Sequence, residues 1–132
     1  MRQINKVFIH CSATKQGRDF DVKDIDLWHK QRGFSGVGYH YVIKLDGTIE
    51  TGRPETKRGA HAKGYNSNSI GVCYIGGLDE NNKPLDTRTK EQKISMDSLI
   101  GKLKDKYKGV ECMGHNEVSS KACPCFNVQN EY

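Results

Sequence analysis

The sequence contains no long hydrophobic run: no apolar stretch approaches the roughly 20 residues that a transmembrane helix needs. The first residues, 1–6, lead directly into a strand-like segment and contain neither the apolar core nor the cleavage site of a secretory signal. We therefore expect a chain that does not insert into a membrane and is cytoplasmic as synthesised. Repeats and low-complexity tracts are also absent, and the 132 residues are expected to form one domain over 1–132.

The five cysteines cannot all be paired in disulfides, because their number is odd. Cys73 and Cys112 lie in apolar, strand-like segments, where a thiol behaves as a small buried hydrophobic group. Cys11, Cys123 and Cys125 lie beside a histidine or in a loop. Without an export signal, metal binding is a better expectation for these thiols than disulfide formation.

The net charge of +5 does not by itself select a partner. Lysine and arginine are spread along the chain and are densest at 102–108, a pattern typical of a solvated helix face. A mildly basic surface also favours approach to an anionic polymer. However, the sequence has no nucleic-acid-binding motif and no basic patch interleaved with aromatic residues, so we expect no nucleic-acid partner.

The order of apolar segments predicts an α/β fold. Apolar runs with strand character occur at 6–10, 39–44, 48–51, 70–75 and 110–113. Asp46-Gly47 indicates a two-residue hairpin turn between the second and third of these runs. Because strands alternate with helical segments, the prediction is a single domain with a central mixed β-sheet flanked by helices.

Two helices are predicted from their end signals. The first is expected to begin after the N-cap Asp21 and to end at Gly33. The second is expected to begin after Thr89, which forms a capping box with Gln92, and to end at Gly109. Between 53 and 69 a long loop rich in glycine, asparagine and basic residues is predicted, and loops of this length are often functional.

His10, His115 and Cys123 form the strongest candidate group for chemistry, since each follows a predicted strand or lies in the next loop. Two imidazoles and a thiolate suit Zn²⁺ and leave a fourth position open. A zinc ion in such a site polarises a carbonyl and lowers the pKa of water from 15.7 towards about 7. Spacing alone does not establish the site, because the sequence has no HExxH or CxxC pair. The alternative to a zinc site is that both histidines are structural.

Six short motifs occur in the order found in one protein family: HCSAT at 10–14, GYHYVIK at 38–44, DGT at 46–48, GAHAKGYN at 59–66, NSIGV at 68–72 and KACP at 121–124. Through them the chain resembles the type 2 N-acetylmuramoyl-L-alanine amidases. The resemblance is greatest to the phage T7 lysozyme branch, which is related to peptidoglycan recognition proteins. It runs from about residue 6 to residue 126.

The resemblance implies the same fold, a mixed sheet flanked by helices, and one Zn²⁺ held by His10, His115 and Cys123. Cys123 is preferred to Cys125 because it occupies the motif position before proline. Cys125 lies at a variable position of the family. We therefore expect it to be a bystander, with substitution for Cys123 as the alternative.

The resemblance also implies roles for other residues. Tyr39 and Lys121 match the catalytic tyrosine and lysine, which would stabilise the oxyanion of amide hydrolysis. His61, Lys63 and Asn66, in the long loop, are candidates for substrate binding. For His61 two alternatives remain open: support of a metal ligand, or hydrogen bonding of its ring to backbone groups only. For Tyr39 the alternative is an aromatic side chain that packs on the sheet.

The two remaining histidines are expected to be structural. His40 should face away from the side of the strand that carries Tyr39, because neighbouring strand residues alternate. His29, beside Trp28 in the first predicted helix, should lie near the surface.

The implied activity is hydrolysis of the amide between N-acetylmuramic acid and L-alanine in bacterial peptidoglycan. The alternative is a non-catalytic peptidoglycan-binding module of the same fold, a class that typically lacks the cysteine ligand. A monomer is expected that acts on the wall after release or dedicated export, either as a phage-type endolysin or as an exported toxin. An immunity or regulatory protein is left open as a partner.

Overall fold

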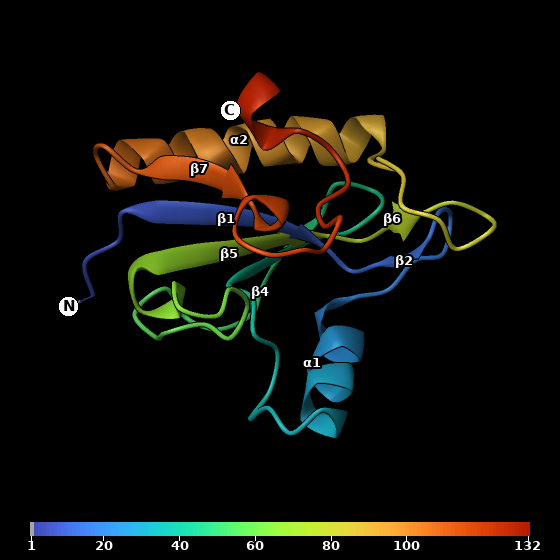
Figure 1. The fold of residues 1–132 in the computed structure, drawn as a ribbon, viewed down its shortest axis with the longest axis horizontal. Helices are drawn as coiled ribbons and strands as arrows, with labels where there is room; N and C mark the ends of the chain where they lie inside the picture. Colours follow the sequence, from blue (N-terminus) through green and yellow to red (C-terminus); the bar gives the residue numbers. More distant parts are fainter. Residues whose placement is uncertain (1) are drawn as a thin grey trace.

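A five-stranded mixed sheet forms the centre of the fold (Figure 1). The computed structural model describes residues 2–132. The strand order is β4-β3-β5-β1-β7, in which β3, β5, β1 and β7 are parallel and β4 is antiparallel to β3. The strands are β1 Lys6–Cys11, β3 Tyr41–Ile43, β4 Ile49–Thr51, β5 Ser69–Tyr74 and β7 Glu111–Gly114. The predicted mixed sheet is confirmed.

The two helices cover opposite faces of this sheet, as Figure 1 shows with α2 above the strands and α1 below them. They comprise α1 Val22–Gln31 and α2 Lys90–Lys106. In β1, Val7, Ile9 and Cys11 belong to the core on the α2 side. Because strand side chains alternate, Phe8 and His10 face the other side. Among residues 2–132 no helix combines the length and apolar character needed to cross a bilayer.

Local end signals define both helices as predicted. Asp21 and Asp24 form a capping box at the start of α1, and Thr89 and Gln92 form one at the start of α2. The Gln92 amide is buried and also donates to the carbonyl oxygens of Ile43, the last residue of β3, at 3.2 Å and of Ile75, the residue after β5, at 2.9 Å. The start of α2 is thereby fixed to the ends of β3 and β5.

The end of α1 corrects the expectation for His29. The backbone N–H of Phe34 donates to the His29 carbonyl and that of Gly33 donates to Lys30, which makes a Schellman turn with Gly33 at φ +93°. This turn folds Phe34 back to a ring-centroid distance of 5.2 Å from His29. His29 is therefore buried rather than near the surface, and its Nδ1 accepts the backbone N–H of Gly38 at 2.8 Å.

The hairpin between β3 and β4 differs from the predicted two-residue turn. Its connection spans 44–48, because Lys44 N–H donates to the Thr48 carbonyl and Gly47 N–H donates back to Lys44, both at 2.9 Å. Gly47 adopts φ +89°, a conformation that favours glycine. A second, two-stranded sheet of β2 Thr14–Lys15 and β6 Gly77–Leu78 was not predicted, since strands of two residues leave no periodic pattern.

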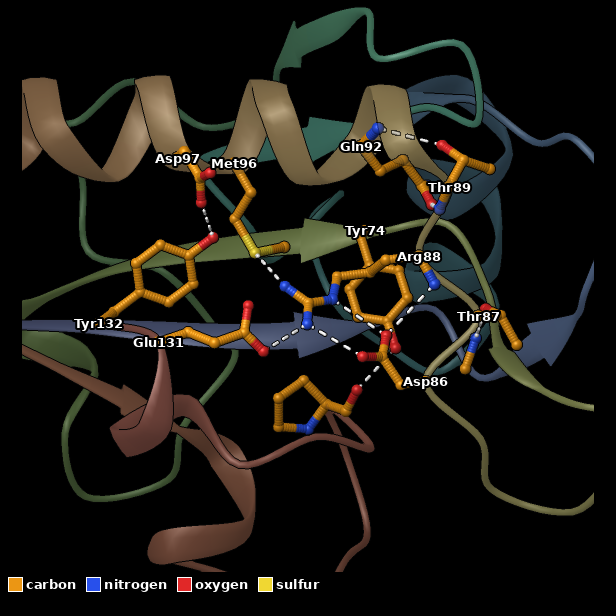
Figure 2. Close-up of polar contacts among 12 residues, drawn as sticks. Tyr74, Asp86, Thr87, Arg88, Thr89, Gln92, Met96, Asp97, Glu131 and Tyr132 are labelled. Carbon is orange, nitrogen blue, oxygen red and sulfur yellow. Dashed lines mark hydrogen bonds and ion pairs between the residues drawn. The ribbon is translucent and has the colours of Figure 1, made fainter.

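A buried arginine ties the C-terminal segment to the body of the fold (Figure 2). The guanidinium of Arg88 makes a two-pronged pair with Asp86, with both N···O distances at 2.9 Å, and donates to Glu131 at 2.7 Å. It also lies 3.4 Å from the ring centroid of Phe126. Because only 1% of the Arg88 side chain is exposed, these contacts are largely shielded from water. They hold the segment that follows Cys123.

Removal of this arginine should destabilise the fold. We expect Arg88→Ala to lower the free energy of unfolding by about 2–4 kcal/mol, because the Asp86 carboxylate loses its partner in a poorly solvated place and Phe126 loses its stacking contact. Denaturant unfolding followed by circular dichroism measures the change. Lys30→Ala, which breaks the exposed pair with Asp26, is the control and should unfold close to the unchanged protein. Equal midpoints for both variants would contradict this role.

Candidate metal centre

Parallel pairing of β1 and β7 brings two histidines together. Ile9 of β1 is in register with Gly114 of β7, so His10 and His115 are the next residues along two neighbouring strands that run in the same direction. Their ring centroids are 4.6 Å apart. His10 is 1% exposed, whereas His115, at the start of the 3-10 helix η2 His115–Glu117, is half-buried. His10 therefore forms the buried side of the pair, and His115 forms the side that is partly exposed to solvent.

Cys123 completes the group from the C-terminal loop. Its Sγ lies 3.8 Å from His10 Nδ1 and accepts the backbone N–H of Cys11 at 3.2 Å. One donor atom from each of His10, His115 and Cys123 lies within 4.8 Å of the other two. The three residues named from the sequence are thus adjacent in space, although 113 positions separate His10 from Cys123.

The donor set fits a single zinc ion. Burial, followed by the neighbouring charges of His61 and His115, places the pKa of His10 well below its usual value. The pKa of His115 is lowered by burial and by Lys121. Both imidazoles are therefore neutral at neutral pH, which is the form that binds a metal. Two imidazoles and one sulfur, with donor atoms within 4.8 Å of one another, match the donor set of a three-ligand zinc site.

The group lies in a cleft of about 650 Å³ that is also lined by both predicted catalytic residues. Tyr39 is half-buried, with its ring centroid 5.0 Å from that of His10, and burial together with nearby thiols raises the pKa of its phenol. The phenol is therefore protonated and able to donate. Lys121 is exposed in the loop before Cys123, so its ammonium can reach the cleft without leaving water. The structure brings these side chains to one place.

The predicted substrate-binding residues separate into two groups. Lys63 is exposed on the cleft lining, free to meet a ligand. The side-chain oxygen of Asn66 instead accepts the backbone N–H groups of His61 and Ala62, both at 2.9 Å, so it shapes the loop. His61 is 9% exposed, and its Nδ1 lies 2.9 Å from His10 Nε2. Its ring is therefore engaged with a candidate metal ligand.

Several residues of the site were not anticipated from the sequence. Arg32, Phe34 and Arg58 line the cleft, and Ser69 lies 3.3 Å from His61 Nε2. Arg58 and Ser69 lie within the long loop predicted at 53–69, and Ser69 also falls in the NSIGV motif, but neither residue was assigned a role from the sequence. Arg32 is the C-cap residue of α1, and only the fold shows that this helix end borders the cleft.

Cys125 lies outside the three-donor group found within residues 2–132. Its Sγ is 3.9 Å from that of Cys11, and both thiols pack beside the candidate centre. Hydrogen bonding with Cys123, followed by burial, raises the pKa of Cys11 to about 12, so this thiol is protonated. Cys73 and Cys112 are buried in β5 and β7 as predicted.

A mixed sheet that carries two imidazoles at the ends of parallel strands, joined by a thiol from the C-terminal loop, defines the class of the protein. Residues 1–126 match the family N-acetylmuramoyl-L-alanine amidase, and the chain belongs to that family. The endolysin of Escherichia phage T7 is 49% identical over 123 residues, which are 93% of this chain and 82% of the phage protein.

Solved structures show the same fold. The N-acetylmuramoyl-L-alanine amidase LysC from Clostridium intestinale superposes with a TM-score of 0.82 at 34% identity, covering 96% of this chain and 79% of that one. The ectodomain complex of peptidoglycan recognition proteins LCa and LCx, solved with bound tracheal cytotoxin, gives a TM-score of 0.77 at 26% identity. That match covers 94% of this chain and 77% of the other.

Proposed function

We propose that the protein is a zinc-dependent amidase that hydrolyses the bond between N-acetylmuramic acid and L-alanine in bacterial peptidoglycan. The observation that carries the proposal is the grouping of His10, His115 and Cys123 donor atoms within 4.8 Å, inside a cleft lined by Tyr39 and Lys121. A binding module needs no such donor set. Amide hydrolysis needs both a strong nucleophile and stabilisation of an oxyanion, and this cleft holds groups suited to each.

His10, His115 and Cys123 would hold the ion. A zinc ion, when bound, supplies Lewis acidity and a low pKa for water. The protein contributes a preformed geometry: β1 and β7 fix the two rings, and the Cys11 N–H donates to the sulfur of Cys123. A hydrogen bond to sulfur stabilises the thiolate form that a metal requires.

Lys121 and Tyr39 would stabilise charge during the reaction. The ammonium of Lys121, which lines the cleft, would neutralise the oxyanion that develops on the scissile carbonyl. The phenol of Tyr39 is protonated and therefore acts as a donor, either to the attacking water or to the same oxyanion.

Substrate binding is proposed for the basic rim of the cleft. Arg32, Arg58 and Lys63 are exposed cations on the lining, and with Lys121 they form a positive border around the candidate centre. Stem peptides of the cell wall carry carboxylates, which such a border attracts. Asn66 and His61 contribute indirectly by shaping the loop that presents Lys63.

The similarity to phage endolysins favours the endolysin alternative over the exported toxin. We accordingly propose cytoplasmic synthesis as a monomer, followed by release to the wall. An immunity protein is then not required.

The experiment is a wall-digestion assay on protein stripped of metal by a chelator and then reloaded. Purified peptidoglycan should release new amino termini with zinc-loaded protein, none with stripped protein, and again after zinc is restored. Magnesium should not restore activity, because it prefers oxygen ligands to sulfur and nitrogen. Protein that sediments with intact wall and releases no amino termini in any metal state would instead be a binding module.

A further inference from the structure

The ring of His61 lies in a slot made by two glycines. A Cβ added to Gly71 would lie 2.7 Å from His61 Cγ and Cδ2, and one added to Gly59 would lie 2.6 Å from Cδ2. Cβ atoms in proteins essentially never approach other heavy atoms this closely, so both positions must lack a side chain for the ring to fit. Asn66 fixes the backbone of His61 from the other side. The ring therefore has one orientation, with its two nitrogens aimed at different partners.

Those partners form a chain of hydrogen bonds that ends at the candidate metal centre. The Ser69 hydroxyl donates to the Tyr65 carbonyl at 2.8 Å. Ser69 Oγ also lies 3.3 Å from His61 Nε2, and His61 Nδ1 lies 2.9 Å from His10 Nε2. His10 Nδ1 then faces Cys123 Sγ at 3.8 Å. All the rings concerned are buried, so water does not compete for these bonds.

The direction of each bond follows from counting protons. Ser69 has one hydroxyl proton, and the Tyr65 carbonyl, which can only accept, uses it. The contact to His61 Nε2 therefore needs a proton on that nitrogen. The His61 ring is 9% exposed, and an imidazole with its single proton on Nε2 carries a lone pair on Nδ1. That lone pair accepts a proton from His10 Nε2, which leaves His10 Nδ1 unprotonated.

We infer that Ser69 and His61 are positioning residues that hold His10 in the Nε2–H tautomer and direct its Nδ1 lone pair at the metal centre. This role rests on the proposed centre and replaces the direct substrate contact considered for His61. Partners that fix the tautomer of a metal-bound histidine typically change affinity 10–100-fold when they are lost. The opposite direction of the chain would place a proton on His10 Nδ1 and leave the Tyr65 carbonyl without its donor.

The first test reads the tautomers directly in metal-free protein. Long-range proton–nitrogen correlation spectra of nitrogen-15-labelled protein distinguish a proton on Nδ1 from one on Nε2 in each ring. We expect Nε2–H for both His10 and His61. A proton on Nδ1 of His10 in the metal-free protein would overturn the inference. This measurement does not depend on whether zinc binds.

The second test measures zinc affinity by competition with a chromophoric chelator. Ser69→Ala removes the acceptor for His61 and should weaken zinc binding about tenfold. Ser95→Ala is the matched control, because Ser95 also donates from its hydroxyl to a backbone carbonyl, that of Gly47, but away from the cleft. An affinity of Ser69→Ala equal to that of Ser95→Ala would overturn the inference.

Substitution of His61 separates the hydrogen bond from packing. In His61→Asn the side-chain oxygen can accept from His10 Nε2, whereas in His61→Leu nothing can. We expect zinc affinity to fall more in His61→Leu than in His61→Asn, with both folded by circular dichroism. Equal losses would mean that the ring only fills space. Failure of the unchanged protein to bind zinc would overturn the proposed function instead, and the tautomer spectra would still be readable.

Discussion

Cys123→Ser is expected to abolish both zinc binding and wall hydrolysis. The variant loses the one sulfur in the three-donor group of the described residues, and a hydroxyl is a far poorer zinc ligand than a thiolate. Metal analysis after gel filtration should find about one zinc ion per chain in the unchanged protein and almost none in the variant. Release of amino termini from peptidoglycan should fall to the level of chelator-treated protein.

Cys125→Ser is the matched control for this experiment. Its sulfur is close to Cys11 rather than part of the donor group, so zinc content and activity should both be retained. If instead Cys123→Ser keeps its zinc while the double variant loses it, Cys125 can take the place of the ligand. Retained metal in both single variants and in the double variant would show that neither Cys123 nor Cys125 is required, contrary to the account.

Lys121→Ala is expected to retain the metal and to lower turnover about 10²-fold or more. The lysine lines the cleft but contributes no donor to the metal group, so its loss removes charge stabilisation without opening the site. Turnover and zinc content should be measured on the same preparation. Because zinc content is preserved, the decrease should appear in kcat and not in the fraction of loaded protein.

Lys108→Ala controls for the general loss of positive charge, since Lys108 is exposed beyond the end of α2 and away from the cleft lining. Its turnover should match that of the unchanged protein. A Lys121→Ala variant with the same turnover as Lys108→Ala would remove Lys121 from the mechanism. The remaining charge stabilisation would then have to come from Tyr39 and the metal.

The parts of the fold encoded by neighbouring residues were predictable. Capping boxes at Asp21 and Thr89 and the glycine at 33 are local signals, and both helices begin, and α1 ends, where these signals lie. The predicted two-residue hairpin turn was too short. The connection spans 44–48, and the hydrogen bond from the Lys44 N–H to the Thr48 carbonyl closes it. His29 was placed at the surface because its burial depends on a turn that folds Phe34 back.

The candidate centre was predictable only through the family resemblance. Nothing in the spacing of positions 10, 115 and 123 shows that they meet; the parallel register of β1 with β7 brings them together. The basic rim joins Arg32, Arg58, Lys63 and Lys121 from separate segments, and such packing leaves no short motif. The contact between His61 and Ser69 joins two of the recognised motifs, but a motif does not show which side chains meet. The pair of Arg88 with Glu131 joins residues 43 positions apart for the same reason.

The most direct test of the central claim is mass spectrometry of the fragments released from purified peptidoglycan by zinc-loaded protein. The account predicts free stem peptides that begin with L-alanine, together with glycan strands of unchanged length that have lost their peptides. Shortened glycan strands, or peptides cut at an internal bond, would contradict it.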